Sequence, residues 1–475
     1  MYYNQALDSL SLYQKLIQYW SVLFDHRNEL AILDNVNFSR HLFPQVIDAA
    51  DILRRIEHEP GYTSPDASSE LGHLIRELEL TRLGRSQKAL SMIGQCGLGV
   101  GNGTSNVIYN ILRVITERSR RQMASARPEV MLALPNYPVY YAQVANLPGT
   151  SVRLFSGAER EGFLPRLADL ESACGENTCA VVLTFPNNPA QFTYEGTLGE
   201  ELRDIVRFCQ ERRIYLIVDN IYEDTLFGRG GSEQNILRLT SMASPDYLLK
   251  VCGPSKDTPF FSGYRFGYWI GDKSIQEEYR TSISSTENCL NSLTITLASF
   301  LLLFKRMDIE GRDLQLDDLQ GLANGNFGWS SHLEDHRLFQ IISERSWLQN
   351  YKEGMRLSNE IQKQALEKVV SFLSHSPVFD ITLNGNLGNI VLTSVKPEYF
   401  SGTGDELFRS LANGPKVGIL PGDVFGVEKL SKHSTAFRLT LVHKPAHEII
   451  ESLEKIERYL RRSAGQRRFD RVSVG

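Results

Sequence analysis

The alternation of short apolar runs with helical stretches over residues 85–290 constrains the fold of this chain most. Between runs of strand length lie segments with helical character, such as 104–116 and 198–212. Strands that alternate with helices in this way predict βαβ units and a largely parallel sheet buried on both faces. We therefore predict an α/β fold with its ligand site at the carboxyl ends of the strands. The expected strands are 129–134, 151–155, 179–183, 214–218 and 247–251.

The length of 475 residues exceeds what one hydrophobic core supports, so at least two domains are expected. We expect residues 1–60 to be a helical segment joining the small domain, 61–304 to be the large domain and 346–475 to be the small one. Residues 305–345 are rich in glycine and charge and are interpreted as an insertion. For the small domain we expect helices at 347–366 and 447–461 and strands at 390–393 and 437–441.

Composition narrows the classes of partner. The net charge of −5 gives no reason to expect nucleic acid. Six cysteines without CxxC spacing or a neighbouring histidine argue against a metal site and a disulfide framework. The first residues do not resemble a secretory leader, and no apolar stretch is long enough to span a bilayer. We expect a cytoplasmic protein that acts on a small molecule, without a membrane partner.

Three loops could present ligand-binding groups. The sequence GLGVGNGTS at 97–105 leads into a helical segment, whose N–H groups and dipole favour an anion, although it could equally be a flexible turn. The sequence LPNYPVYY at 134–141 offers tyrosine rings for stacking, although core packing is the plainer explanation of that loop alone. In LTFPNNPA at 183–190, an asparagine between prolines can present its amide to a fixed ligand oxygen.

Two charged residues directly follow expected strands. Asp219 ends the run 214–218, where a carboxylate is costly unless it meets a cation or a donor; capping the next helix is the alternative interpretation. Lys256 lies just beyond the run 247–251, where a lysine can lose its proton readily and form an imine with a carbonyl. Lys250 is expected to be a solvated surface residue, as most lysines are.

In their order and spacing, these loops resemble the class I/II aminotransferase family of fold-type I pyridoxal-phosphate (PLP) enzymes, to which aspartate aminotransferase belongs. The resemblance runs from about residue 62 to residue 438. It implies a large PLP-binding domain with a mostly parallel sheet, a smaller α/β domain, and transferase activity in amino acid metabolism. The motifs that carry it are the glycine-rich turn, the tyrosine loop, PNNP at 186–189, DNIY at 219–222, SK at 255–256 and GYRFGY at 263–268.

The resemblance implies a role for each matching residue. Lys256 would hold PLP as a Schiff base and later move the proton at the substrate Cα. Asp219 would pair with the pyridine nitrogen, and Asn188 and Tyr222 with the ring hydroxyl. The other implied cofactor-binding residues are Tyr137 as the stacking ring and Gly103, Thr104, Ser105, Ser255 and Arg265 around the phosphate.

Two further matches concern the substrate and the assembly. Arg438, in AFRL at 436–439, corresponds to the arginine that grips the substrate α-carboxylate with its bidentate fork. Tyr62, in GYTSP at 61–65, corresponds to a tyrosine that reaches the phosphate of the neighbouring subunit. The resemblance therefore implies a homodimer with active sites at the subunit interface.

The sequence also departs from the family pattern. The family's Thr-Gly after the asparagine motif is Ala190-Gln191 here, and the serine often found three residues before the lysine is Gly253. Arg265 lies one position further from Lys256 than is usual, and the segment 305–345 has no counterpart in compact members.

These departures keep a rival to transamination open. The alternative is PLP-dependent elimination, replacement, cyclisation or decarboxylation of an amino acid such as S-adenosylmethionine, in a specialised biosynthetic pathway. The triplet Ser255-Lys256-Asp257 and the chain length also resemble aminocyclopropane-carboxylate synthase. A transcription regulator would need a DNA-binding module that residues 1–60 are too few to hold. A dehydrogenase would require Asp219 and Lys256 to match the PLP pattern by accident.

Overall fold

The structure of this protein is a computed structural model that describes the greater part of the chain. No helix in this part of the chain is long and apolar enough to cross a membrane. The described residues are 5–35, 39, 42, 69–122, 127–195, 197–225, 234–239, 244–259, 261–287, 289–313, 346–381, 385, 388–427 and 434–472.

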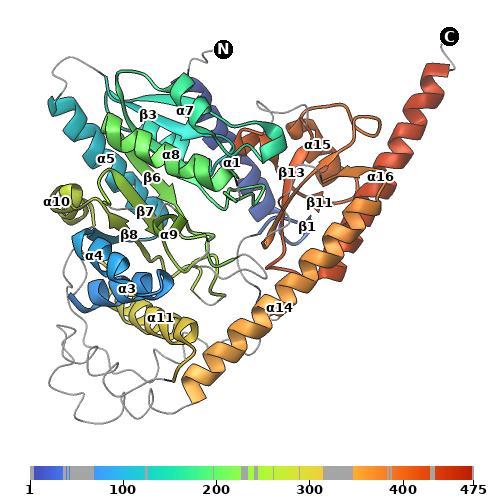
Figure 1. Ribbon diagram of the computed structural model, residues 1–475. Helices are drawn as coiled ribbons and strands as arrows, with labels where there is room; N and C mark the ends of the chain where they lie inside the picture. The colour runs from blue at the N-terminus through green and yellow to red at the C-terminus, as the bar shows by residue number, and fades with distance from the viewer. Residues whose placement is uncertain are drawn as a thin grey trace.

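A seven-stranded sheet forms the centre of the larger part of the molecule (Figure 1). Its strand order is β2-β8-β7-β6-β5-β3-β4, and β8 runs antiparallel to both of its neighbours while the pairs from β7 to β4 are parallel. The strands are β2 (Gly97–Gly101), β3 (Glu129–Ala133), β4 (Ser151–Phe155), β5 (Thr178–Thr184), β6 (Tyr215–Asp219), β7 (Leu248–Cys252) and β8 (Gly267–Gly271).

The five strands expected from apolar runs correspond to β3–β7, and each of their ends lies within one residue of the expectation. β3, β5, β6 and β7 are buried along their whole length, as a parallel sheet covered on both faces requires. β2 and β8 were not expected. The first half of the supposed glycine-rich turn is strand β2, and only its end is a loop.

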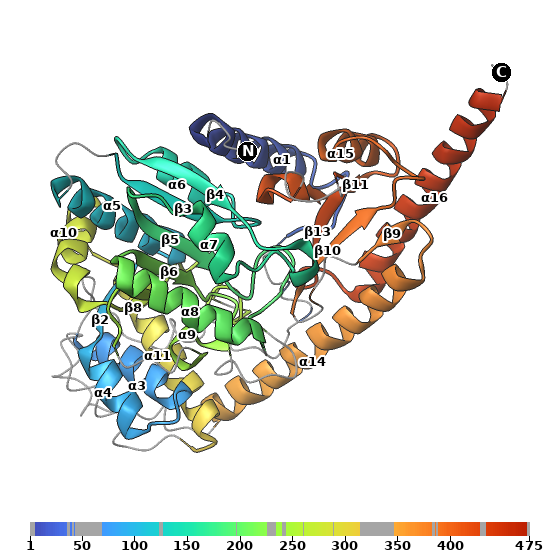
Figure 2. The same ribbon diagram turned by 45° about the horizontal axis from the view of Figure 1, so that its top comes forward.

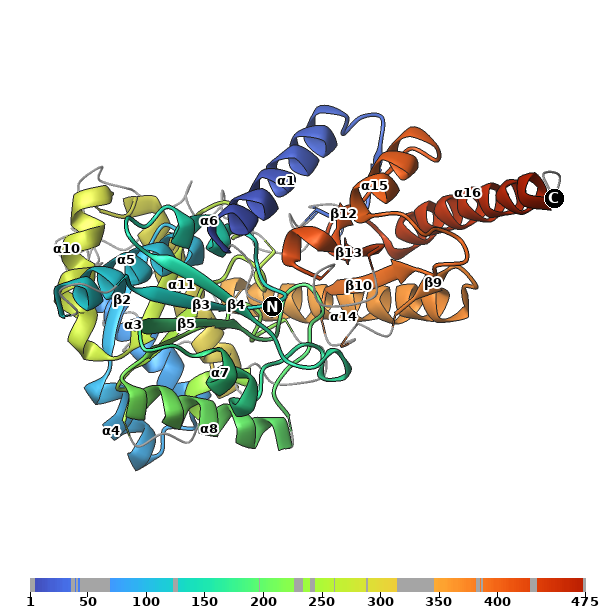
Figure 3. The same ribbon diagram turned by 90° about the horizontal axis from the view of Figure 1, so that it is seen from above.

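Helices cover both faces of this sheet (Figure 3). One face packs against α5 (Thr104–Gln122), α6 (Val139–Ala145) and α10 (Gln276–Thr286) in a core that includes Ile108 and Tyr141. The other face packs against a core that includes Leu202 and Leu301. The elements on that second side are α3 (Ser69–Arg82), α4 (Gln87–Gln95), α7 (Leu167–Ala173), α8 (Thr197–Arg212) and α11 (Ser292–Glu310).

The C-terminal part contains a second, smaller sheet with the order β12-β13-β10-β9, antiparallel throughout. Its apolar core is separate from the two cores of the large sheet. Two long helices lie along this small sheet (Figure 2). The elements are α14 (Ser346–His375), β9 (Phe379–Asp380), β10 (Ile390–Val395), α15 (Gly404–Asn413), β11 (Val417–Gly418), β12 (Leu420–Pro421), η4 (Gly422–Phe425), β13 (Ala436–Thr440) and α16 (Ala446–Val472).

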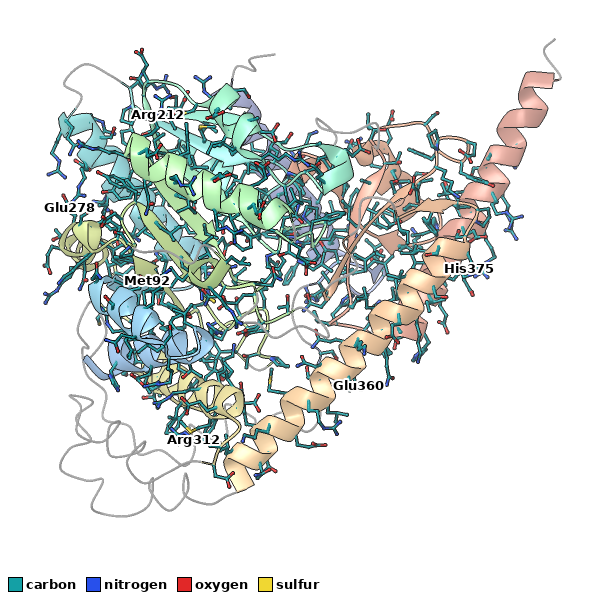
Figure 4. All side chains as sticks on the ribbon, in the orientation of Figure 1. Met92, Arg212, Glu278, Arg312, Glu360 and His375 are labelled. Atoms are coloured by element: carbon teal, nitrogen blue, oxygen red, sulfur yellow. The ribbon has the colours of Figure 1, made fainter. Side chains whose placement is uncertain are left out.

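The segment expected as an insertion begins inside a helix, since α11 continues to Glu310. The carbonyl oxygen of Arg312 accepts a hydrogen bond from Nζ of Lys352 on α14 at 3.2 Å. Figure 4 marks Arg312 near the start of α14, and Glu360 and His375 further along that helix. The end of α11 and the first turns of α14, which flank residues 314–345, therefore lie close together.

The N-terminal helix α1 (Gln5–Asp25) bridges the two parts of the molecule, as Figure 3 shows. It contacts α6 and β4 on one side and η4 on the other. Leu16, Tyr19 and Leu23 are buried in the core of the smaller part. After the helix, β1 (Ala31–Ile32) pairs in parallel with β11.

The expectation that Lys250 is a surface residue is wrong. Lys250 lies in β7, is completely buried, and its Nζ lies 2.8 Å from carboxylate oxygens of both Glu79 and Glu223. Burial alone would lower the pKa of Lys250, but the charges of Glu223 and Glu79 outweigh it and raise that pKa. Arg82 joins the same cluster, with Nη1 2.9 Å from Glu79 and 2.5 Å from Glu223. A buried lysine of this kind requires paired carboxylates, which the pattern of a single strand does not reveal.

Candidate functional site

One cavity of about 120 Å³ gathers the predicted site residues at the carboxyl ends of the parallel strands. All of them line this cavity except Tyr62, which lies outside the described residues. The roles of these residues stay predictions, but the structure places the residues together around one cavity. The lining residues are Trp20, Gly103, Thr104, Ser105, Tyr137, Tyr140, Thr184, Asn188, Asp219, Ile221, Tyr222, Ser255, Lys256, Arg265, Phe266 and Arg438.

One end of the cavity is suited to an anion. Gly103 has a φ of +87°, which a glycine adopts without strain, and the next residue begins the 19-residue helix α5. A Cβ on Gly103 would lie only 2.7 Å from Nη2 of Arg265, so the guanidinium packs directly against the glycine backbone. The first-turn N–H groups of α5 and the cation of Arg265 together make an environment for a phosphate group.

Close packing explains why position 253 is a glycine where the family often has serine. A Cβ on Gly253 would lie 2.8 Å from the carbonyl oxygen of Phe266 and 3.2 Å from Cγ2 of Thr104. A serine side chain would not fit without a shift of the backbone. Ser255 lines the cavity nearby and is the hydroxyl available in this loop.

Lys256 is held in the cavity wall by bonds from both parts of the molecule. The next residue, Asp257, forms an ion pair with Lys305 of α11. The carbonyl oxygen of Lys256 lies 3.5 Å from Nδ2 of Asn389 in the smaller part. Burial lowers the pKa of the Lys256 amino group to about 8, and the positive charges of Arg438 and Arg265 add to this effect. Part of the Lys256 population is therefore unprotonated at neutral pH, as a nucleophile or base must be.

Asp219 ends β6 as a buried carboxylate. Burial raises the pKa of Asp219 to about 6, while hydrogen bonds from the Tyr140 hydroxyl and the Ile221 N–H oppose the rise. Among the described residues, no lysine or arginine forms an ion pair with it. A buried carboxylate without such a partner suits a ligand that brings a cationic N–H group.

Three further polar residues, Tyr137, Asn188 and Tyr222, line the cavity. Tyr137 lies edge to face with Tyr140 at a centroid distance of 5.6 Å. Asn188 directs its Oδ1 to Nη1 of Arg438 at 3.1 Å, whereas the side chain of Asn187 bonds the backbone of Gly162 and Phe192. Burial raises the pKa of the Tyr222 hydroxyl, so this group stays protonated and can donate a hydrogen bond.

The far end of the cavity holds Arg438 from β13, and this arginine already has a carboxylate partner. Nη2 of Arg438 lies 2.9 Å from Oδ2 of Asp34, which follows β1. The motif at 436–439 indicates the arginine, whereas no motif in the sequence indicates this acid.

Several residues of the site were not predicted from the sequence, among them Tyr140, Trp20 and Asp34. Tyr140 stood in the tyrosine loop, and its spacing of three from Tyr137 is one helical turn, so it could have been found. Trp20 lies on α1 and Asp34 after β1, both far in sequence from the motifs. No pattern within the chain indicates that either reaches the site, because tertiary packing of the N-terminal segment brings them there.

The known sequences that this chain resembles are those of aminotransferases. A model of the family described as aminotransferase class I and II matches residues 30–307. An aspartate aminotransferase of Bacillus sp. (strain YM-2) is 24% identical over 366 residues, which cover 76% of each chain. An alanine aminotransferase of Mycobacterium tuberculosis (strain ATCC 25618 / H37Rv) is 28% identical over 169 residues, which cover 36% of this chain and 35% of that protein.

Solved structures resemble most of the chain. An aspartate aminotransferase from Rhizobium meliloti matches with a TM-score of 0.66 at 19% identity, covering 94% of this chain and 96% of the other. An aspartate aminotransferase from Thermotoga maritima matches with a TM-score of 0.64 at 18% identity, covering 95% and 97%. At these identities the likeness shows the fold.

Proposed function

This chain belongs to the aminotransferase class I and II family, and from that premise we propose that it transfers the amino group of an α-amino acid. The family, the fold-type I α/β architecture, the enzymatic class and PLP as cofactor, all expected from the sequence, are confirmed. The particular activity and the residue roles are our proposals. The observation that supports them is the single cavity that holds Lys256, Asp219 and Arg438 together.

The residues of the cavity fit PLP. The Gly103 turn, the first turn of α5 and Arg265 would hold the phosphate, where a Cβ would fill the cradle. Asp219 would pair with the protonated ring nitrogen, and Asn188 and Tyr222 would lie at the ring hydroxyl. Tyr137 would pack against the ring, with Thr104, Ser105 and Ser255 as further phosphate ligands.

The chemistry divides between the cofactor and this chain's own groups. When bound, PLP withdraws electrons from the substrate Cα and so makes its proton acidic. The amino group of Lys256, whose pKa burial lowers to about 8, would bind the cofactor covalently and would then move the proton at Cα. Tyr140 and the Ile221 N–H favour the ionised form of Asp219 by donating to its two oxygens, and so oppose the burial that raises its pKa to about 6. At the other end, Arg438 would face the carboxyl end of the substrate.

The first experiment is a visible absorption spectrum of the purified protein with PLP, for wild type, Lys256→Ala and the control Lys273→Ala. Lys273 is an exposed residue at the start of the short 3-10 helix Lys273–Ile275. We expect a band of protein-bound PLP in wild type and in the control, and its loss or shift in Lys256→Ala. A spectrum equal to that of PLP in buffer for all three proteins would refute the assignment of Lys256.

The product of a single turnover separates transamination from its rival. We expect an amino acid to release its oxo acid, about one per bound PLP, without ammonia. An altered carbon skeleton, or ammonia release, would instead favour the cyclisation, replacement or elimination chemistry kept open by the Ser255-Lys256-Asp257 triplet.

We also propose a homodimer in which Tyr62 of one subunit reaches the phosphate site of the other. Within the chain we propose the domain bounds expected from sequence: 61–304 and 346–475 as the two domains, 1–60 joined to the smaller one, and 305–345 as an insertion. The separate apolar cores of the two sheets support a division into two domains, while Leu348 and Tyr351 at the start of α14 pack in a core of the large sheet. The cytoplasmic location stays a prediction.

A further inference from the structure

The arginine at the substrate end of the cavity is already engaged by the protein. Nε of Arg438 lies 3.2 and 3.3 Å from the two carboxylate oxygens of Asp34, and Nη2 lies 2.9 Å from Oδ2. Nη1 donates to Oδ1 of Asn188 at 3.1 Å. All three nitrogens of the guanidinium therefore have an acceptor, and its charge is neutralised by a carboxylate.

This ion pair is buried on both sides. The side chain of Asp34 is 1% exposed and that of Arg438 is 5% exposed. The ring of Phe425 covers the guanidinium, with its centroid 4.7 Å from Cζ. Breaking a buried pair leaves an uncompensated charge and is strongly unfavourable, so the pairing is a stable part of the site.

Backbone bonds on either side of Asp34 fix its position. Leu33 donates its N–H to the carbonyl oxygen of Gly418 at 2.8 Å and accepts from the N–H of Thr440 at 3.1 Å. Asn35 donates its N–H to Oγ1 of Thr440 at 2.9 Å and accepts from that hydroxyl at 2.8 Å. Asp34 is therefore held beside Arg438 by bonds to β11 and to β13, the strand that carries the arginine.

This geometry changes what Arg438 can bind. A free substrate carboxylate would become a second anion on a guanidinium that Asp34 has neutralised, and would bring one net negative charge into a buried place. A neutral carbonyl oxygen carries no such penalty. Within the described part of the chain, the bonds above use three of the five N–H groups of Arg438 and leave one on each of Nη1 and Nη2. Those two can still donate to an uncharged acceptor.

We propose that Asp34 determines substrate specificity, and that the site favours amino acids whose carboxyl end is uncharged, as an amide or an ester, over free α-amino acids. The inference rests on the proposed function, because it assumes that Arg438 faces the carboxyl end of the substrate. It narrows that function to one class of amino-acid derivative.

The test uses the PLP-loaded protein and a pair of ligands that cannot react. The probes are 3-phenylpropanoate and 3-phenylpropanamide, which differ only in the charge of the carboxyl end and lack an amino group. Their dissociation constants are measured by calorimetry for wild type, Asp34→Asn and Asp423→Asn. Asp423 is the matched control, because it is a buried aspartate of the same small part whose partner is Lys15 at 3.1 Å.

We expect wild type and the Asp423→Asn control to bind the amide roughly tenfold more tightly than the carboxylate. In Asp34→Asn the order should reverse, because Arg438 then carries an unneutralised charge. Tighter binding of the carboxylate by wild type would overturn the proposal, and so would an equal ratio in wild type and Asp34→Asn. If Asp34→Asn does not fold, the wild-type ratio alone decides.

A reactive pair then shows whether the preference governs turnover. We compare kcat/KM for L-phenylalaninamide and L-phenylalanine in wild type and Asp34→Asn. Because the same two substrates are used in both proteins, the difference in basicity of their amino groups cancels. The value of kcat/KM for the amide divided by that for the free acid should be roughly tenfold or more lower in Asp34→Asn than in wild type, mainly because KM for the free acid falls. An unchanged ratio contradicts the proposal.

Failure of this inference is distinguishable from failure of the proposed function. Loss of the Lys256-dependent PLP spectrum would remove the function before any ligand is added. A normal spectrum together with a carboxylate preference in wild type would leave the function intact and remove only the role of Asp34.

Discussion

At the scale of single residues, the site is organised around charges that the protein keeps away from water. Asp219 is the clearest case, because it is buried at the end of β6, accepts hydrogen bonds from a tyrosine hydroxyl and a backbone N–H, and forms no ion pair with a lysine or arginine of the described residues. Such a residue serves ligand binding at a cost to the ligand-free protein.

Because burying the charged form of Asp219 destabilises the ligand-free protein, we expect the stability of that protein to depend on pH. Burial raises its pKa to about 6, whereas an unfolded chain titrates an aspartate near about 3.9. Between these values the folded state binds more protons, so the free energy of unfolding falls as the pH rises from about 4 to about 6 and stays lower above that. In cofactor-free protein at pH 7, Asp219→Asn should therefore be more stable than wild type, by on the order of 1–3 kcal/mol.

Urea unfolding at several pH values between 5 and 8 measures this difference. The gain of Asp219→Asn should grow with pH over the lower half of this range. Asp246→Asn, at an exposed position, is the control and should follow wild type. A gain for Asp219→Asn that does not change with pH would show that burial of the charge is not its cause.

At the scale of elements, the strands differ in how far sequence alone predicts them. The buried parallel strands β3, β5, β6 and β7 are mostly apolar runs of strand length, which makes them recognisable in the sequence, and β4 is a shorter mixture of apolar and polar residues. β2 has the sequence GLGVG, which is typical of a turn, and its glycines have a tertiary cause. A Cβ on Gly99 would lie 2.3 Å from Nε1 of Trp269 in β8, and one on Gly97 would lie 2.7 Å from Cα of Lys273. No local pattern predicts a strand whose composition is set by an aromatic ring from 170 positions further along.

The centre of β7 depends on an ion cluster. Lys250 lies between Glu79 and Glu223, and Arg82 pairs with both acids. Replacing Lys250 with methionine removes one cation and leaves Arg82 as the one cation that, within the described residues, pairs with the two buried carboxylates. We expect Lys250→Met to lower the free energy of unfolding by about 3–5 kcal/mol.

Urea denaturation followed by circular dichroism checks this value. Lys273→Met, at an exposed lysine, should change the free energy of unfolding by no more than about 0.5 kcal/mol. If Lys250→Met changed the free energy of unfolding as little as that control, the ion cluster would contribute little to the stability of the fold.

At the scale of the whole molecule, the site is assembled from both ends of the chain. The motifs from Gly103 to Arg265 lie in one stretch, and that is why their order could be compared with a family pattern. The contact between Asp34 and Arg438 spans 404 positions and depends on the pairing of β1 with β11. Sequence reasoning identified the arginine from its motif but had no means to identify its partner.

The proposed dimer makes a prediction at the same scale. Lys256→Ala and Tyr62→Ala should each be inactive or nearly so, because one removes the lysine of its own site and the other removes a phosphate ligand of the partner's site. Mixed after gentle dissociation, they should recover activity, since each mixed dimer has one site with both residues intact. With random pairing, about a quarter of the wild-type activity should return.

Enzyme assays on the mixture, with each variant alone as control, measure this recovery. Two variants of the same residue, Lys256→Ala with Lys256→Gln, should recover nothing. An absence of recovery in the first mixture, with mixed dimers demonstrated by native mass spectrometry, would place Tyr62 outside the partner's site.

The bridging position of α1 has a consequence for how the protein is made. Leu16, Tyr19 and Leu23 are buried against the small part of the molecule, and β1 pairs with β11 at residues 417–418. A ribosome that has released α1 must add nearly four hundred residues before those partners exist, which at typical speeds of about 5–20 residues per second takes tens of seconds. During that interval the large sheet can fold, while the apolar face of α1 waits exposed. The N-terminal segment is therefore the part of the nascent chain for which we expect chaperones to have the longest access.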